Sequence, residues 1–419
     1  MTGRLGRRDV LKGIGAAGAA SVVGLAGCVD TGGGAGEIDL GLLMGVTGQL
    51  EDLGPPIRAG SEAAVEQINE GDTDWEVNPR FEDTGTNSEQ GVDGAQAIVD
   101  AGFPMFVGAL ASTVSIPVAE NVTLEEGVVQ MSPASTAVEY STLDEDLDST
   151  LTWRTTPSDA FQGGVAASIA RDRIGAESVS TIARDDAYGR GLTGEFAAAF
   201  SDDGGTVHEE LTIDPANDTF TAQLQTALDP DPDMLYIVAF PEEGQNLLRD
   251  FYEEFDQSDL PLMVPDGLQE VTLPADSGQD VETFSNVTGT GPGISDDVAS
   301  GLDSYQERVD SDFVFVREAY DAAAVLCLAR VAADSEEPTD IQAEIRSVTS
   351  GEGETVSADN LVEGLEMAAD GDDIVYNGVS RPLEFDENGD VATPVYEYFG
   401  WTTNDEGDPA LETLDVITG

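Results

Sequence analysis

The stretch "PMFVGALASTVSIPVAENVTLEEGVVQMS", residues 104–132, decides the fold of this chain. It opens on the apolar run "PMFVGA" and closes on "VVQMS", and both runs are typical of buried strands. Between them, residues 113–126 have the apolar spacing of a helix. Parallel strands need a long crossover connection between them, and a helix of this length can supply it. The two strands can therefore pair in parallel. The stretch therefore predicts an α/β fold.

The same alternation of strands and helices continues on both sides of this stretch. Further strand-like runs lie at residues 38–46, 75–83, 178–183, 206–213, 233–240 and 260–265. Further helical patterns lie at residues 57–69, 89–101, 159–172, 192–201, 219–228 and 242–255. A helical segment at 313–333 and a strand-rich tail from Ile374 follow. Strands that alternate with helices indicate doubly wound parallel sheets covered on both faces, and two series of such units predict two similar lobes.

The first 28 residues, "MTGRLGRRDVLKGIGAAGAASVVGLAGC", have the pattern of an export signal. Arg7 and Arg8 form the twin arginine of a route that exports folded proteins. The final Leu-Ala-Gly-Cys resembles a lipobox, which predicts that Cys28 is lipidated and becomes the new N-terminus. An uncleaved membrane helix is the alternative, but residues 13–27 are short and rich in glycine. Residues 29–37 read as a flexible tether, so we expect a lipid-anchored protein on the extracytoplasmic face of the membrane.

The composition is extremely acidic. The formal net charge is −66, from 83 acidic and 17 basic residues, and the one lysine, Lys12, lies in the signal. Such a surface repels itself in dilute buffer and is tolerated near molar salt, where the Debye length is about 3 Å. The composition therefore resembles that of extreme halophiles, and it argues against nucleic acid as a partner. Cys327 lies on an apolar helical stretch and is expected in the core; without a Cys/His cluster, no metal or other cofactor is expected.

Residues 189–194, "GRGLTG", spell the G-x-G-x-x-G pattern of dinucleotide-binding folds. In those folds the first glycine follows a strand directly. Here the strand at 178–183 ends well before Gly189, and two aspartates, which would repel a phosphate, lie between them. We therefore interpret residues 184–191 as a loop that leads into a helix.

Two loops carry candidate ligand-binding groups. "GALAST", residues 108–113, and "MSPAST", residues 131–136, follow neighbouring strands at the edge where open α/β sheets bind ligands. Ser112 is a suitable N-cap, and a helix N-terminus can receive a carboxylate. Thr136 can offer an N–H and a hydroxyl, Ala134 a carbonyl, and Ser135 lies between them. Ordinary capping and turn chemistry is the alternative explanation for both loops.

Seven phrases, in order from about residue 37 to 295, resemble the Leu/Ile/Val-binding proteins, the ligand receptors of branched-chain amino-acid ABC importers. They are "GLLMGVTGQLEDLG", "FEDTGTNSEQGVDGAQAIV", "VGALASTVSIPVAENVTLEEGVVQMSPASTAVEY", "LTWRTTPSDAFQGGVAA", "ARDDAYGRGLTGEF", "FPEEGQNLLRDF" and "LMVPDGL". The resemblance implies a type I periplasmic binding protein, in which a three-segment hinge joins two lobes that close on a ligand. We expect lobe 1 to comprise residues 38–155 and 290–373, and lobe 2 residues 156–289 and 374–419.

The resemblance also implies roles for particular residues. Ser112 and Thr136 match positions that hold the α-carboxylate of an amino acid, and Thr136 also touches its ammonium. Tyr188 is expected to face the ligand from the second lobe. Asp266, in "VPDGL", stands where the family usually has a glutamate that pairs with the ammonium, so the charge is kept on a shorter side chain.

Two departures affect the pocket wall. Leu53 stands where the family often has an aromatic residue, and Ala239 where it often has a tyrosine. Because each contact of methylene size changes affinity by about 1–3 kcal/mol, the preferred side chain can differ from that of the family.

These observations predict a lipid-anchored solute-binding protein, a monomer that delivers an amino acid, branched-chain or similar, to an ABC permease and ATPase. A receptor of the same fold for urea, a short amide or an aromatic or organic acid is the alternative, and it would not need the full clamp. An enzyme is not expected: the chain has no G-x-S-x-G or Ser/His/Asp phrase, and its single histidine, His208, is expected on a strand.

Overall fold

The computed structural model describes residues 36–418, apart from 145–149, 256, 258, 296–300, 310 and 312. The predicted signal, with Cys28, lies outside the described residues, as does most of the predicted tether. The last two residues of that tether, Gly36 and Glu37, instead begin strand β1, and the Gly36 N–H donates to the Asp74 carbonyl. Among the described residues, no helix is both long and apolar enough to cross a membrane.

The first sheet has five strands in the order β2-β1-β3-β4-β5, all parallel. The strands are β1 (Gly36–Met44), β2 (Trp75–Asp83), β3 (Met105–Gly108), β4 (Val129–Ser132) and β5 (Thr152–Arg154). The two strands predicted from residues 104–132 are neighbours, and every residue of β3 and β4 is buried. The parallel α/β unit that the sequence predicts is thus present.

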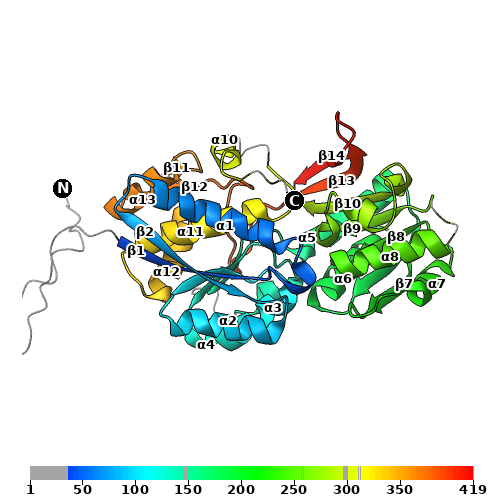
Figure 1. The fold of residues 1–419 in the computed structure, drawn as a ribbon, viewed down its shortest axis with the longest axis horizontal. Coiled ribbons are helices and arrows are strands. Elements are labelled where there is room, and N and C mark those ends of the chain that lie inside the picture. The colour runs from blue at the N-terminus through cyan, green and yellow to red at the C-terminus, as the bar shows by residue number, and fades with distance from the viewer. Residues whose placement is uncertain are drawn as a thin grey trace, which may run out of the picture. The chain divides into compact units, whose positions relative to one another are not determined.

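Helices cover both faces of the first sheet (Figure 1). They are α1 (Gly54–Glu70), α2 (Ser88–Asp100), α3 (Ser112–Val118), α4 (Leu124–Glu126), α11 (Val316–Ala333), α12 (Pro338–Thr349) and α13 (Leu361–Asp370). The single helix expected at 113–126 consists of α3 and α4 joined by a π-helical turn, Ala119–Thr123. This π-helical turn follows Pro117, which has no N–H to donate to the regular hydrogen bonds of the helix.

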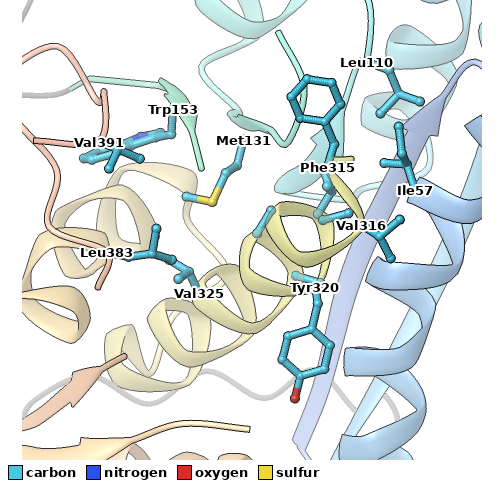
Figure 2. Close-up of a cluster of buried hydrophobic side chains, with 14 of the residues drawn as sticks. Ile57, Leu110, Met131, Trp153, Phe315, Val316, Tyr320, Val325, Leu383 and Val391 are labelled. Carbon is cyan, nitrogen blue, oxygen red and sulfur yellow. The ribbon is translucent and has the colours of Figure 1, made fainter. Parts of the chain in front are cut away.

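Helix α11 lies in the centre of the first lobe. Almost all of its residues from Val316 to Val331 are buried. Cys327 is one of them, as predicted. Figure 2 shows Val316, Tyr320 and Val325 along this helix, with Phe315 at its N-terminal end. The helix packs against α1, α12 and α13 and against the strands of the first sheet. Most of its residues are apolar, as a buried helix requires, and its buried acids Glu318 and Asp321 have partners in Arg381 and in Tyr376 and Ser380.

The second sheet has seven strands in the order β14-β13-β10-β9-β8-β6-β7. The strands are β6 (Ser178–Arg184), β7 (Thr206–Ile213, with His208), β8 (Met234–Val238), β9 (Leu262–Pro265), β10 (Val287–Pro292), β13 (Val395–Thr403) and β14 (Pro409–Thr418). The helices of this lobe are α5 (Asp159–Ile169), α6 (Ala187–Asp202), α7 (Thr221–Leu228), α8 (Pro241–Glu254) and α9 (Leu273–Asp276). Strands β6 to β10 are parallel, and β13 and β14 add an antiparallel edge. The prediction of an α/β fold with two lobes is confirmed.

The pairing of the strands puts two lobe boundaries at other residues than expected. Strand β10 pairs with β9 and β13, so the chain leaves the second sheet after Pro292 rather than at residue 289. Strand β12 (Ile374–Tyr376) pairs with β11 (Glu354–Val356), not with the second sheet. The reason is Asp321 on α11, whose carboxylate accepts hydrogen bonds from Tyr376 and from residues 379–380. The chain returns to the second sheet at Val395.

Three chain segments cross between the sheets: residues 155–158, the segment that follows Pro292, and residues 377–394. Arg381, fully buried in the third segment, ties them together. Its guanidinium donates to the Thr155 carbonyl at 2.7 Å and to the Gly293 carbonyl at 3.0 Å. It also pairs with Glu318 of α11 at 2.7 Å. Arg381 therefore joins all three chain segments that run between the two lobes.

Candidate functional site

A small cavity lies between the two sheets. Its wall is formed by Leu50, Leu53, Ile57, Leu110, Ala111, Ser112, Ala134, Thr136 and Phe315 from the first lobe and by Tyr188, Phe240, Asp266 and Gly267 from the second. Most of these residues follow the carboxyl ends of parallel strands, where open α/β sheets bind ligands.

Ser112 and Thr136 lie at the first-lobe wall of the cavity, and both are buried. Ser112 is the first residue of α3, whose N-cap is Ala111, so its expected role as N-cap is wrong. The extended backbone at Ala111 ends the loop one residue earlier, which puts the Ser112 side chain in the first helical turn. Its Oγ accepts from the Ala137 N–H at 3.2 Å, and the hydroxyl hydrogen can still be donated. In the first turn of α3 the Val114 N–H already donates to the Ala111 carbonyl at 2.9 Å, which leaves the N–H groups of Ser112 and Thr113 without an intrahelical acceptor.

Arg154 holds the loop that carries Thr136. Its guanidinium is fully buried and donates to the carbonyls of Ser135 and Ala137, at 3.2 and 3.0 Å, on either side of Thr136. Asp390, from the third crossover, pairs with the same guanidinium at 2.6 Å. Burial acts to lower the pKa of Arg154, but Asp390, together with Asp159 and Tyr140, outweighs it and the pKa is raised, so the arginine stays charged. Sequence reasoning missed this support, because the partners lie far apart in the chain.

Two residues expected at the site lie behind its wall. The Ser135 hydroxyl contacts Ser115 Oγ at 2.5 Å and donates to the Leu110 carbonyl at 3.0 Å, so it stabilises the loops rather than lining the cavity. Ala239 is buried in the apolar core of the second lobe, and its neighbour Phe240 lines the cavity instead. Ala134 and Leu53 do line the cavity, as expected.

Tyr188 reaches the cavity from helix α6, which begins at Ala187 and not at residue 192. The sequence predicted a loop here, but the Asp186 carboxylate accepts from the Gly189 N–H at 2.9 Å and caps the helix. All three glycines of the G-x-G-x-x-G pattern therefore lie within the helix. The Tyr188 ring stacks on Phe240 with centroids 5.5 Å apart, and the two rings form one wall.

Asp266 follows strand β9 and is 3 % exposed. Its carboxylate accepts from Gln162 Nε2 at 2.7 Å and from the Tyr188 hydroxyl at 3.3 Å. Burial raises the pKa of Asp266 to about 6, and the hydrogen bonds from Gln162 and Tyr188 oppose that rise. The carboxyl is therefore ionised at neutral pH, but its buried negative charge is poorly solvated.

Asp159, the first residue of α5, is a second acid beside the cavity that sequence reasoning missed. It is 0 % exposed, and neither carboxylate oxygen has a hydrogen-bond partner among the described residues. Burial raises the pKa of Asp159 well above its usual range, and the charge of Asp266 raises it further. The Thr136 hydroxyl lies close enough to oppose this rise, but its geometry falls short of a hydrogen bond. A buried carboxyl without a partner is costly, so this place suits a donor or a cation.

The remaining wall is apolar. Leu50, Ile57 and Leu110 join Leu53 there. Phe315 completes it at the N-terminal end of α11 (Figure 2), with a left-handed backbone, φ 67°. That conformation is costly for a bulky residue and is often kept where function needs it. The helix expected from 313 begins only at Val316, because Phe315 leaves the helical region.

Two parallel-sheet lobes, a three-segment hinge and a cavity between the strand ends define the class of two-lobed α/β binding proteins. Within the described residues, no cluster of His, Cys, Asp or Glu could hold a metal ion. The chain belongs to the periplasmic binding protein family, whose sequence pattern matches residues 37–411.

Individual relatives are similar at modest identity. Leu/Ile/Val-binding protein homolog 3 of Brucella melitensis is 28 % identical over 219 residues, which are 52 % of this chain and 58 % of that relative. A leucine-binding protein of Thermotoga maritima superposes with a TM-score of 0.72 at 22 % identity, over 91 % of this chain and 98 % of the other. An ABC-transporter solute-binding protein of Rhodopseudomonas palustris, in complex with 4-hydroxybenzoate, has a TM-score of 0.74 at 15 % identity, over 91 % and 97 %.

Proposed function

We propose that this protein is the extracytoplasmic solute-binding component of an ABC importer, and that it binds an α-amino acid between its lobes for delivery to a permease. The observation that carries the proposal is the distribution of polar groups around one cavity. Ser112 and Thr136 supply donors from the first lobe, and Asp266 supplies a buried carboxylate from the second.

This distribution matches a zwitterion. A carboxylate suits the Ser112 and Thr136 hydroxyls and the first-turn N–H groups of α3. An ammonium suits Asp266, whose charge is poorly solvated in the empty site. We assign Asp159 to the same end of the ligand, because its oxygens have no partner and its charge interacts with that of Asp266. One ligand would then bridge the two lobes, and that differential contact is what can favour closure.

The apolar wall points to a hydrophobic side chain on that amino acid. The names of relatives support the same class, since one is called a Leu/Ile/Val-binding protein homolog and another a leucine-binding protein. We therefore propose a branched-chain or similarly small apolar amino acid.

An aromatic or organic acid is the second candidate. It is favoured by the aromatic wall of Tyr188, Phe240 and Phe315 and by the similar protein in complex with 4-hydroxybenzoate. Such an acid has no ammonium, so Asp266 would stay charged without a counter-ion or would have to take up a proton. Unpaired buried charges are strongly unfavourable, which ranks this candidate below the amino acid.

We also propose that Cys28 carries the lipid anchor and that the protein acts as a monomer, outside the cytoplasm and without enzymatic activity. The N-terminal sequence alone supports the anchor.

A thermal-unfolding panel in molar salt tests the ligand class. It compares aliphatic amino acids, their des-amino acids, 4-hydroxybenzoate, urea and short amides. Ligand at a hundredfold excess over Kd stabilises the folded state by about 2.7 kcal/mol. We expect this shift for a small apolar amino acid and not for its des-amino analogue. A larger shift with the des-amino or aromatic acid would replace the amino-acid assignment with the second candidate, and no shift with any compound would reject both.

A further inference from the structure

A hydrogen bond joins the two lobes beside the cavity, outside the residues that line it. Gln49, in the short helix Gly48–Leu50 of the first lobe, accepts from Arg184 Nη2 with its Oε1 at 2.9 Å. Arg184 ends strand β6 of the second lobe. The bond therefore exists only while the lobes are together, since opening the cleft would separate its two partners.

Arg184 is fixed within its own lobe. It is buried, its Nη1 pairs with Glu243 at 2.5 Å, and its Nε pairs with Asp186. Glu243 is itself buried, and Asp186 caps α6. The guanidinium thus has its position before the lobes meet, so a bond to Gln49 requires little further ordering of this side chain.

The same arginine supports the cavity wall. Its guanidinium carbon lies 3.6 Å from the centre of the Phe240 ring, and the other partner in that stack is Tyr188. On the first lobe, Gln49 is followed directly by Leu50, which lines the same cavity. The interlobe bond and the cavity wall are therefore built from neighbouring groups on both sides of the cleft.

We propose that Gln49 and Arg184 form a closing contact that stabilises the closed protein and sets how long a ligand stays bound. They are positioning residues, because neither lines the cavity. The inference rests on the proposed two-lobed trap, but it holds whichever small solute is bound, since the contact does not involve the ligand. Removing it would raise the rate of opening and of ligand release and leave the order of preference among ligands unchanged.

Three variants of the full chain test the contact. Gln49→Leu keeps the size and removes the acceptor, and Gln49→Asn keeps the amide but shortens its reach by one methylene. Gln96→Leu is the matched control: it is also a half-buried glutamine of the first lobe, but its amide donates to Asp100 of its own helix.

Hydrogen exchange without ligand, in molar salt, measures opening directly, because amides at the cavity exchange when the lobes part. The relevant peptides cover residues 110–115 and 264–268. A hydrogen bond to a charged group predicts roughly tenfold faster exchange in both Gln49 variants. Gln96→Leu is expected to exchange like the parent. Unchanged exchange in Gln49→Leu, or parent-like exchange in Gln49→Asn, would overturn the closing contact.

Ligand release supplies a second readout. With the amino acid that gives the largest thermal shift, the dissociation rate is expected to rise roughly tenfold in both Gln49 variants, with the ranking of amino acids unchanged. A changed ranking would place Gln49 among the specificity residues and overturn the positioning role. If no amino acid binds the parent, the proposed function fails, while the exchange experiment still decides the contact.

Discussion

Replacing Asp266 by asparagine should stabilise the empty protein and weaken ligand binding at the same time. The substitution keeps the size, and an amide oxygen can still accept from Gln162. Burial raises the pKa of this carboxyl from 3.8 to about 6. A rise of that extent means that the ionised carboxylate lowers the stability of the folded protein by about 3 kcal/mol, as an order of magnitude.

The sign of the pH dependence follows from the raised pKa. Between about pH 4 and 6 the folded parent holds a proton that the unfolded chain has released, so this group destabilises the parent progressively as pH rises, and fully above about 6. The asparagine variant has no such dependence. Its advantage in stability should therefore be largest above pH 6 and vanish near pH 4.

Ligand affinity should change in the opposite direction. A charge-assisted hydrogen bond contributes about 1.5–3 kcal/mol, so Asp266→Asn should lower amino-acid affinity roughly ten- to a hundredfold. Parent affinity should also fall as pH drops below about 6, where Asp266 is protonated. Calorimetric titrations and thermal melts from pH 4 to 8 in molar salt measure both effects. A variant that is less stable than the parent at pH 7.5, or one that binds the amino acid equally well, would refute the reasoning.

Two further predictions concern the N-terminus and the surface. Cys28→Ser should release the protein from membranes or block its processing, and a variant that still fractionates with membranes like the parent would contradict lipidation. With a net charge of −66, the chain should lose structure as salt is diluted below about molar, because the Debye length grows past a few ångströms; a circular dichroism spectrum and melting point unchanged in dilute buffer would exclude this.

The fold was predictable because its signals are local. Strands β3 and β4 are short apolar runs bounded by loops, and they need no knowledge of distant residues. The errors arose where a distant partner decides the structure. Strand β12 stays with the first lobe because Asp321, far away on α11, binds the segment that follows it.

The candidate site was predictable to the extent that its residues follow strand ends. Ser112, Thr136 and Asp266 all do, and all line the cavity. Asp159 and Arg154 gave no such signal. Their importance comes from burial and from partners that only the folded chain brings together, such as Asp390 beside Arg154. The start of α6 lies earlier than predicted because the Asp186 cap outweighs the two glycines, Gly189 and Gly191, of the expected loop.

The use of cations inside this acidic protein gives a further reason to expect a cationic ligand group. The buried guanidiniums of Arg154, Arg184 and Arg381 each pair with an acid of their own. Asp159 differs from these acids: desolvation and the charge of Asp266 together push its pKa upward, and Arg154, the cation that opposes this rise, is already paired with Asp390. Under the proposed function, the ammonium of the ligand would supply the positive charge that these two carboxyls lack, and that added contact would favour the closed state.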